Sequence, residues 1–369
     1  MTRQLVAESL LAQDALARFQ SLVDELVNVL GNLAVVAAIE VHGCERRYFT
    51  AGHVDLGRLE AARPDHLFQI GSQSKTVVAM TVLLLHRARL LNLDTRVRHY
   101  LDLPIDDRIT VRHLIMNTCG LGETTLAMLP ARLDPRLKVA PRDLLALALP
   151  QGQLFEPGSR FDYCNTGWVI AALLIEAVCT APYGQVVRER TCEPLGLTNT
   201  FLGGGAPKDQ MIRGYLASAA TSGLVDIANC HEWAYGAGDG VSSLDDMLQI
   251  FGSLCRLDSA IGVTLGDLTG MTAKPAQSPY FPLSVGTEYG FGLERRAWAG
   301  SEVWGHPGST SSYLSGTWID ANRGVTVSTC VTRAVTLPAT EDAELRYPRE
   351  RLFAMALNTA YTLALDLAR

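Results

Sequence analysis

Apolar residues recur at helical spacing near the start of the chain. They are Leu16, Phe19, Val23, Leu26 and Leu30. Side chains three and four positions apart share one helical face, so we expect an amphipathic helix over residues 7–30 with Gly31 as its stop. Two strand-like runs follow at 33–41 and 46–51, with the segment around Gly43 as the turn between them.

The middle of the chain combines apolar helical patterns with loops. A continuous apolar run at 77–85 predicts a buried helix, and residues 92–103 are expected to form a loop. Ser243 and Asp246 are spaced as a capping box, which predicts a helix that begins there and continues to Phe251. The other expected helices are residues 110–116, 141–149 and 166–178.

From residue 289 the pattern changes to short strands. The expected strands are residues 289–298, 301–304, 313–319 and 325–331. An amphipathic helix at 349–367 is expected to close the chain. Strands at both ends of the sequence favour the α+β class, with one antiparallel sheet built from both termini, flanked by helices, and a mostly helical insertion. We expect a discontinuous sheet domain (1–80 and 285–369), a helical domain (81–284), and an active site at their interface.

Composition and charge argue against several classes of partner. With 369 residues, 48% of them hydrophobic, the chain is large enough to bury a substantial core. The formal net charge of −6, without any basic run, argues against nucleic acid and anionic membranes. No apolar run reaches the roughly 18–20 residues that span a bilayer, and no secretory signal pattern precedes the first helix. We therefore expect a cytoplasmic protein.

Thiols and imidazoles are scattered along the chain. The eight cysteines contain no C-x-x-C pair, which favours buried thiols in a protein without a secretory signal. The eight histidines are dispersed as well, and the sequence has neither an H-E-x-x-H motif nor a cluster of cysteine and histidine. We expect no metal and no other cofactor.

One lysine stands at a spacing that suits nucleophilic catalysis. The chain has only four lysines among its 32 basic residues, and Lys75 follows Ser72 by three positions at the start of the apolar helix. Residues i and i+3 share a helical face, so the hydroxyl and the amine are neighbours. A buried lysine can lose its proton and act as a base, which arginine cannot. The pair indicates a serine nucleophile with a lysine activator, although a buried serine beside a lysine that reaches solvent gives the same pattern.

Two further segments complete a set of ordered motifs. Tyr163 and Asn165 stand two positions apart at the mouth of the apolar helix, and Gly-His-Pro-Gly-Ser at 305–309 lies just before a predicted strand. With S-x-x-K, Y-x-N and H-x-G in this order, the chain resembles the class C β-lactamase and D-Ala-D-Ala carboxypeptidase superfamily of penicillin-binding-protein-like serine hydrolases. This superfamily also holds β-lactamase-like esterases, D-amino-acid peptidases and amidases, and acyltransferases.

The resemblance runs from about Asp65 to Val331 and implies the β-lactamase/transpeptidase fold. Four shorter segments support it, at residues 110–114, 193–197, 238–243 and 289–293.

The resemblance implies a role for each motif residue. Ser72 attacks a carbonyl carbon and becomes acylated, and Lys75 and Tyr163 together supply the general base, with the choice between them left open. Asn165 holds Lys75 and the acyl-side carbonyl of the substrate, which is compatible with capping the following helix. His306 tunes the electrostatics around Tyr163. A core tyrosine and a structural histidine at a strand edge are the alternative interpretations.

An oxyanion hole is also implied by the resemblance. The backbone N–H groups of Ser72 and Ser309 would form it, and Gly308 would let the strand approach the substrate closely because it has no Cβ. Five aromatic residues flank the motifs and are candidates for lining an acyl pocket or for packing in the core. They are Trp168, Trp233, Tyr235, Trp304 and Tyr313.

The chain departs from its relatives at two positions. Pro307 stands where relatives that bind a β-lactam or a peptide carboxylate usually carry Thr. Proline has neither a hydroxyl nor an N–H, so we infer that a free carboxylate beside the scissile bond is not required. The turn at 117–120 reads Asn-Thr-Cys-Gly where relatives usually read His-Thr-Ser-Gly. This turn is structural in the family, so no chemistry is assigned to Cys119.

The sequence therefore predicts a serine hydrolase that cleaves a small ester or amide through an acyl intermediate on Ser72. An acyltransferase with the same residues, in which an amine or alcohol replaces water at deacylation, is the first alternative. A D,D-peptidase or β-lactamase, which Pro307 makes less favourable, and a non-catalytic binding or scaffold relative are the others. Segments 123–141 and 208–237, expected to select the substrate, carry no motif, and the sequence leaves the oligomeric state open.

Overall fold

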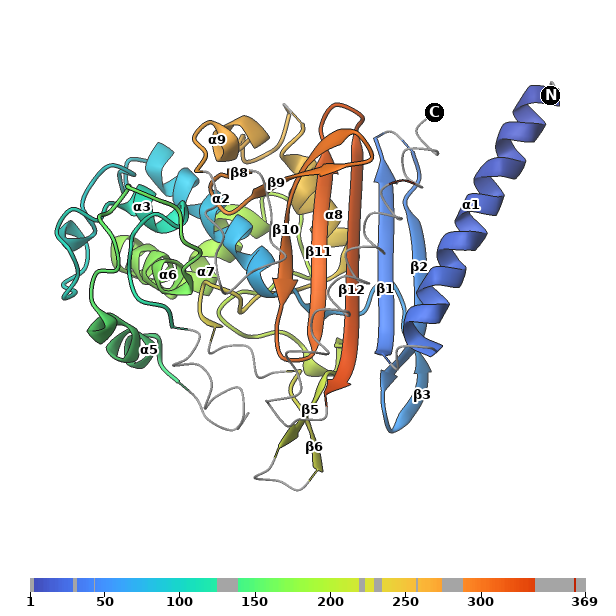
Figure 1. The fold of residues 1–369 in the computed structure, drawn as a ribbon, viewed down its shortest axis with the longest axis horizontal. Helices are drawn as coiled ribbons and strands as arrows, with labels where there is room; N and C mark the ends of the chain where they lie inside the picture. Colours follow the sequence, from blue (N-terminus) through green and yellow to red (C-terminus); the bar gives the residue numbers. More distant parts are fainter. Residues whose placement is uncertain are drawn as a thin grey trace.

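An antiparallel sheet built from both ends of the chain organises this computed structural model of the protein (Figure 1). In spatial order its strands are β3 (Arg58–Ala61), β2 (Arg47–Asp55), β1 (Asn32–Val41), β12 (Val325–Val335), β11 (Tyr313–Asp320), β10 (Ser301–Ser309), β9 (Glu294–Trp298) and β8 (Glu288–Tyr289). The structure describes residues 3–28, 32–42, 44–124, 139–218, 223–228, 234–256, 258–273, 288–335 and 362.

Two smaller strand pairs accompany the large sheet. One consists of β5 (Tyr215–Ser218) and β6 (Gly223–Asp226), of which β5 extends the sheet by pairing in parallel with the end of β12. The other joins β4 (Phe68–Gln69) to β7 (Val241–Ser242) directly before the turn that carries Ser72. This second pair brings the segment around residue 240 next to that turn.

The helices of the structure vary widely in length. The α-helices are α1 (Arg3–Asn28), α2 (Ser74–Arg87), α3 (Val111–Ile115), α5 (Pro141–Ala148), α6 (Asn165–Cys179), α7 (Tyr183–Val187), α8 (Leu244–Ser253) and α9 (Leu265–Thr269). Short 3₁₀ turns are η1 (Gly71–Gln73), η2 (Val97–His99), η3 (Leu149–Gln151) and η5 (Lys208–Gln210), and η4 (Arg188–Cys192) is a π-helical turn.

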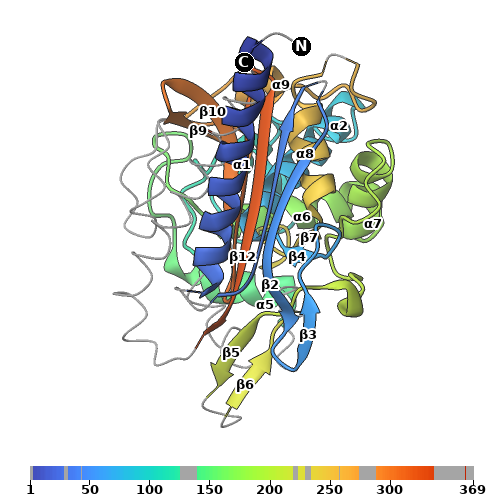
Figure 2. The ribbon, with the colours of Figure 1, turned by 90° about the vertical axis from the view of Figure 1, so that its right-hand side faces the viewer.

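Both faces of the sheet are buried at its centre, as strand β1 demonstrates. Successive residues of a strand point to opposite faces, so β1 contributes to two apolar clusters. Val35, Ala37 and Ile39 pack with α1, whereas Ala34, Val36 and Ala38 face the main core, which contains α2, α6 and α8. Figure 2 shows α1 along one face of the sheet and α8 behind the other. This burial on both sides explains why β1 is an almost continuous apolar run.

Helix α6 is apolar on all sides because it lies inside the main core. Every residue from Thr166 to Ile175 is buried, which is typical of a central helix rather than a surface one. Among the described residues no single helix is long and apolar enough to cross a membrane. Helix α6 and the segment Tyr183–Cys192 would together be long and apolar enough, but they are bent by 81° relative to each other.

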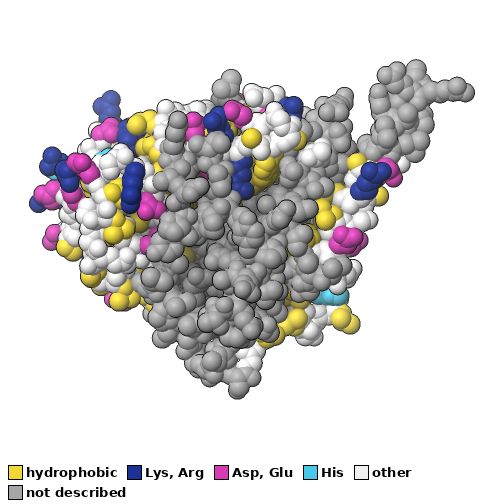
Figure 3. Space-filling model, viewed as in Figure 1, with side chains coloured by type: hydrophobic (Ala, Val, Ile, Leu, Met, Phe, Trp, Pro, Cys, Tyr) yellow, Lys and Arg dark blue, Asp and Glu magenta, His cyan; other side chains and the backbone are white. Residues whose placement is uncertain are grey.

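Charged side chains of both signs are mixed on the surface. Figure 3 shows basic and acidic groups interspersed on one face, without a large patch of one sign among the described residues. Many of them pair, for example Arg112 with Asp94 at 2.7 Å and Arg108 with Asp106 at 2.8 Å. Exposed pairs of this kind contribute little stability, about 0–1 kcal/mol each.

Most of the expected elements are confirmed, with boundaries shifted by a few residues. Ser243 caps α8 as expected, since its Oγ accepts the backbone N–H of Asp246 at 3.3 Å. The expected strand 289–298 is wrong in one respect, because β8 and β9 are separate strands joined by a turn at Gly292, which has a φ of 68°. The expected helix 349–367 and the turn at Gly43 lie outside the described residues, and the division into two domains stays a prediction.

Strand β10 is longer than expected and contains the H-x-G motif, which the sequence pattern had placed before a strand. Glycine and proline at 305–308 are unusual inside a strand. They are tolerated here because β10 pairs with β11 up to Ser309 but with β9 only up to Gly305. No described strand pairs with residues 306–309 on that second side. Proline fits such an edge, where no N–H donor is needed.

Candidate active site

Ser72 and Lys75 lie where the chain enters α2. The turn η1 carries Ser72, packs against β10 and β11, and continues directly into α2. Ser72 remains partly exposed, whereas Lys75 is completely buried. Ser72 can thus be reached in part from outside, whereas the amine of Lys75 cannot.

Three oxygen atoms surround the amine of Lys75. Its Nζ lies 3.0 Å from Ser72 Oγ and 2.8 Å from Asn165 Oδ1, and it also contacts the backbone oxygen of Ala237. A protonated amine would donate to all three oxygens, whereas a neutral amine has two donors and one lone pair. In the neutral form, donation to Asn165 and Ala237 leaves the lone pair free to accept the proton of Ser72.

Burial shifts the protonation equilibrium of Lys75 toward the neutral form. Loss of hydration lowers the pKa of the amine from 10.5 to about 7, although the negative charges of Glu123 and Asp239 oppose this shift. A considerable share of the molecules therefore has a neutral amine at neutral pH.

Glu123 fixes the direction of the Asn165 amide. Its carboxylate accepts the backbone N–H of Asn165 at 2.8 Å and the side-chain Nδ2 at 3.1 Å. A carboxylate can only accept hydrogen bonds, so Nδ2 must point to Glu123 and Oδ1 to Lys75. The sequence did not mark Glu123 as a site residue, because no local motif indicates a contact between residues 42 positions apart.

Tyr163 lies close to both Ser72 and Lys75. Lys75 Nζ is 4.8 Å from the centre of the Tyr163 ring, and the phenol hydrogen-bonds with Ser72. Burial raises the pKa of the phenol well above its usual range, and the bond with Ser72 offsets only part of this rise. The phenol is therefore protonated at neutral pH, which suits it to donate or relay a proton.

His306 is a neutral imidazole in the wall of the site. Burial lowers its pKa to about 3, and the nearby charge of Lys75 acts in the same direction. Its Nδ1 lies 2.6 Å from the backbone oxygen of Pro307, and its Nε2 lies 3.0 Å from the hydroxyl of Tyr289. An N–H on Nδ1 that donates to Pro307 leaves Nε2 to accept from Tyr289. The imidazole ring centre is 6.2 Å from that of Tyr163, so His306 acts on Tyr163 as a neutral neighbour.

Tyr289 is a second residue near the site that our sequence analysis did not assign. Its ring packs edge-on against Tyr163 at 6.2 Å between centres and against His306 at 5.8 Å. The three rings form one cluster, in which Tyr289 and His306 are buried and Tyr163 is partly buried. The segment 289–293 had supported the family resemblance, but its position in the chain did not show that Tyr289 contacts His306.

Gly308 lies against the turn that carries Ser72. A Cβ atom on Gly308 would lie only 1.9 Å from the backbone oxygen of Ile70. Backbone atoms cannot give way cheaply, so position 308 accepts only glycine. The absent side chain thus allows β10 to reach the nucleophile.

The backbone nitrogen of Ser309 lies beside the turn that carries Ser72. A Cβ on Gly71 would be 2.8 Å from the nitrogen of Ser309. Thr310 donates its N–H to Tyr313 of β11 at 2.9 Å, and successive N–H groups of a strand point to opposite sides. The Ser309 N–H therefore points away from β11, to the open edge. An N–H that faces this edge beside the turn of Ser72 fits the oxyanion hole that the family resemblance implies.

Two of the five aromatic candidates are core residues. Trp168 and Tyr313 are completely buried. The indole N–H of Trp168 donates to Asn117 Oδ1 at 2.9 Å, and the hydroxyl of Tyr313 donates to the backbone oxygen of Ile212 at 2.7 Å. Of the two roles open to them, packing in the core is the one that fits, because both side chains are enclosed by the fold.

The other aromatic candidates lie at different places. Trp304 is partly buried in β10 and packs against the main core. Tyr235 lines a cavity of about 400 Å³ together with Tyr183 and Glu176, and none of the motif residues lines that cavity. Trp233 lies outside the described residues.

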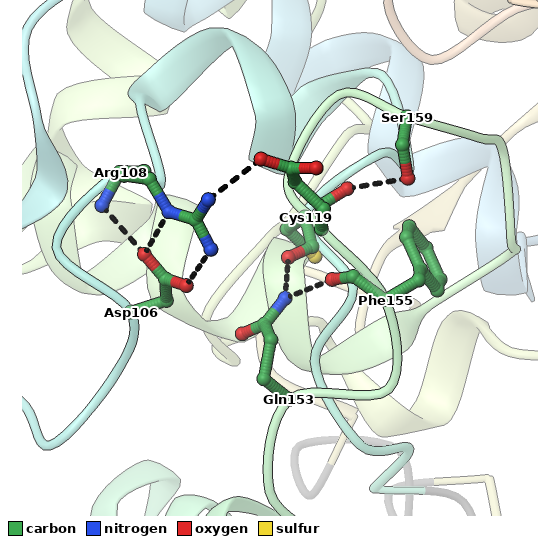
Figure 4. A network of polar contacts seen from close by, with 7 residues as sticks. Asp106, Arg108, Cys119, Gln153, Phe155 and Ser159 are labelled. Atoms are coloured by element: carbon green, nitrogen blue, oxygen red, sulfur yellow. Dashed lines mark hydrogen bonds and ion pairs between the residues drawn. The ribbon is translucent and has the colours of Figure 1, made fainter.

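A polar network supports the loops before Tyr163 (Figure 4). Gln153 Nε2 donates to the backbone oxygens of Cys119 at 2.7 Å and Phe155 at 2.6 Å, which joins the turn at 117–120 to the segment that leads to Tyr163. Arg108 reaches across to Glu156 at 2.6 Å. Cys119 thus contributes a backbone oxygen to this network, in agreement with a structural turn.

The described ranges contain no group of side chains that could hold a metal ion. No set of three or more His, Cys, Asp or Glu side chains comes together there.

Comparisons with known proteins agree with the geometry. A family model described as Beta-lactamase matches residues 19–348. A D-aminopeptidase of Brucella anthropi is 28% identical over 227 residues, which is 61% of this chain and 42% of that protein. The chain thus spans about half the length, or less, of the curated relatives it matches.

Solved structures with the same fold include two that are named as an amidase and an amidohydrolase. The D-amino acid amidase of Ochrobactrum anthropi SV3 superposes with a TM-score of 0.80 at 24% identity, covering 95% of this chain and 98% of that chain. A D-stereospecific amidohydrolase from Streptomyces sp. superposes with a TM-score of 0.70 at 26% identity, covering 86% and 94%. This protein belongs to the beta-lactamase family and has the β-lactamase/transpeptidase-like fold.

Proposed function

We propose that the protein hydrolyses small amides of D-amino acids, through an acyl intermediate on Ser72. The observation that carries the proposal is the environment of Lys75, a buried amine with a pKa of about 7 and its Nζ 3.0 Å from Ser72 Oγ. The names of the relatives support the substrate class, since a D-aminopeptidase, a D-amino acid amidase and a D-stereospecific amidohydrolase are among them. Small esters of the same acids, which have a better leaving group, are expected substrates as well.

In the first half of the reaction Ser72 Oγ attacks the carbonyl carbon of the amide. Lys75 Nζ takes the hydroxyl proton as the C–O bond forms, and the N–H groups of Ser72 and Ser309 stabilise the negative charge on the carbonyl oxygen. Tyr163 then passes its proton to the leaving amine as the C–N bond breaks, and Lys75 Nζ returns to the phenol the proton that it took from Ser72. The protonated phenol suits this role, and we assign the base to Lys75 and the relay to Tyr163.

In the second half water replaces the amine. A water molecule attacks the acyl carbon, its proton moves through the Tyr163–Lys75 pair, and the bond to Ser72 Oγ breaks as that oxygen regains a proton. The products are the free acid and the original enzyme, so the proton count is balanced over the cycle.

Two residues around Ser72 favour a substrate that carries an amine and has no carboxylate beside the scissile bond. Glu123 places a negative charge beside Asn165, which suits the α-ammonium of an amino-acid amide. Pro307 provides no hydroxyl for a substrate carboxylate and stands at the open edge of β10. Both features favour an amide of an amino acid over a β-lactam or a D,D-dipeptide terminus.

Hydrolysis of D- and L-phenylalanine amide, with and without Ser72→Ala, tests the proposal. We expect release of ammonia from the D form, a much slower reaction with the L form, and no activity in the variant. A fluorophosphonate probe should label wild type and leave Ser72→Ala unlabelled. Faster cleavage of nitrocefin than of any amide or ester, or a fully active Ser72→Ala, would refute the assignment.

An added amine separates hydrolysis from acyl transfer. After acylation by an activated ester, hydrolysis gives the free acid even when hydroxylamine is present at moderate concentration. A product that is mostly hydroxamate under those conditions would instead identify the protein as an acyltransferase that uses the same residues.

A further inference from the structure

Asp239 is a completely buried carboxylate next to the site, and every contact it makes is with a donor. Both of its oxygens accept the hydroxyl of Tyr183, at 2.6 and 2.7 Å. Oδ1 also accepts the backbone N–H of Gly236 at 3.1 Å, and Oδ2 accepts that of Gly203 at 3.0 Å. A site that offers only donors is built for the ionised form of the side chain.

These contacts fix the turn that carries Ala237. Gly236 and Asp239 lie on either side of Ala237, whose backbone oxygen contacts Lys75 Nζ. The turn also continues into Gly240, whose N–H donates to Ser74 Oγ at 2.9 Å beside the nucleophile. Asp239 is therefore the residue that connects this turn to α7, through Tyr183.

We propose that Asp239 is a positioning residue for Lys75, which places the Ala237 carbonyl under the amine and stabilises the ammonium form by its charge. The proposal rests on the proposed function, in which Lys75 is the base. Glu123 has the matching role on the other side, because it directs Asn165 Oδ1 to the same amine. A carboxylate thus holds each of the two oxygens to which a neutral Lys75 donates: Glu123 holds Asn165 Oδ1, and Asp239 holds the backbone oxygen of Ala237.

The charged and titratable groups around Lys75 come from several elements. Glu123, Cys164 and Asp239 raise the pKa of the amine, in this order of size, against the larger effect of burial. The phenol of Tyr163 and the neutral imidazole of His306 also face it. Removal of the charge at position 239 should therefore lower the pKa of Lys75.

Groups around Asp239 itself are few. Burial raises the pKa of its carboxyl to about 6, which the bonds from Tyr183, Gly203 and Gly236 partly offset. The charge of Asp239 also helps to raise the pKa of the Tyr235 phenol, whose hydroxyl donates to Glu176 at 2.5 Å.

Asp239→Asn tests the charge and the geometry together. An asparagine amide would turn an NH₂ group toward the N–H of either Gly203 or Gly236, so one of these bonds must be lost. We expect the rate of labelling by a fluorophosphonate at about pH 8 to fall by about 10–100-fold, since a misplaced catalytic group costs rate of this order. The pH at which half of Lys75 is neutral, read from its ¹³Cε resonance in the NMR spectrum, should move to lower pH.

Two variants serve as controls. Asp246→Asn removes another buried carboxylate that accepts a backbone N–H, from Asn199 at 2.8 Å, and should leave the Lys75 titration unchanged. Tyr183→Phe keeps the charge of Asp239 but removes a donor, so the titration should shift in the same direction by a smaller amount. This second variant also provides the test if Asp239→Asn does not fold.

The two proposals can fail separately. If the fluorophosphonate does not label Ser72 in the wild-type protein, the proposed function is refuted. The titration of Lys75 would still test the role of Asp239 in that case. An unchanged Lys75 titration in both Asp239→Asn and Tyr183→Phe, with only a lower melting temperature, would show that Asp239 is merely structural and overturn this inference.

Discussion

Replacement of Lys75 by arginine removes a base while it keeps a positive charge. The amine of Lys75 is completely buried and has a pKa of about 7. A guanidinium, in contrast, stays protonated at any pH at which the protein is folded. Lys75→Arg therefore separates the two possible uses of this side chain, as a proton acceptor or as a fixed charge.

The size of the expected effect follows from the pKa. At pH 7 an amine with a pKa of about 7 is half neutral, whereas one with a pKa of 10.5 is neutral in about three of 10⁴ molecules. Burial thus increases the available base by roughly 10³. General-base catalysis contributes about 10²–10⁴ in rate, so we expect Lys75→Arg to lower kcat/KM by about 10³.

The assay is the rate of D-phenylalanine amide hydrolysis from about pH 5 to about pH 9. For wild type, kcat at saturating substrate should rise with pH up to about 7 and then level off, because the neutral form of Lys75 is the active one. The chain offers a matched control in Lys208→Arg. Lys208 is half-exposed and pairs with Asp226 at 3.4 Å, so this variant should retain wild-type activity.

Two results would refute the reasoning. A folded Lys75→Arg enzyme with activity within tenfold of wild type would mean that the amine is not the base. A wild-type profile without any change near pH 7 would mean that the amine does not titrate there.

Three further predictions concern other parts of the site and the core. Gly308→Ala should reduce kcat by about 10²–10³, because its Cβ would meet the backbone oxygen of Ile70 at 1.9 Å and displace an oxyanion donor. As a control, Gly57→Ala should leave kcat unchanged, because no heavy atom lies closer than 3.5 Å to its Cβ. Tyr163→Phe should lower turnover by about 10²–10⁴ without loss of thermal stability, and an unchanged rate would exclude the phenol as a relay. Trp168→Ala should reduce the free energy of unfolding in urea by about 3–5 kcal/mol, and a loss below 1 kcal/mol would contradict its burial at 0% exposure.

The chemistry of the site was predictable because it is concentrated in short motifs. Ser72 and Lys75 are three positions apart, so one helical turn determines their contact. Tyr163 and Asn165 likewise begin one helix, and ordered motifs indicated that these segments meet. The roles of these residues, the domain division and the cytoplasmic location stay predictions.

The residues that support the motifs were not predictable, because each acts through a distant part of the chain. Glu123 contacts Asn165 across 42 positions, and Tyr183 contacts Asp239 across 56. Neither pair has a fixed spacing that a pattern can mark. Their positions follow only from the packing of α6 and α7 around the turn that carries Ala237.

Several elements were missed for a related reason. The short strands β3 to β7 have two to four residues each, too few to show an alternating pattern. Burial of Trp168 and Tyr313 was equally invisible, since an aromatic residue beside a motif is as common in a core as in a pocket. Such positions depend on which faces of the helices meet.

The titration of Lys75 tests the central claim most directly, and the sequence makes it practical. The chain contains only four lysines, so ¹³C-labelled lysine gives few Cε resonances, and Lys75→Arg identifies the relevant one by its disappearance. We predict that this resonance titrates with a midpoint near pH 7. If it titrates instead above about pH 10, like an exposed lysine, the amine is charged under working conditions and the account is wrong.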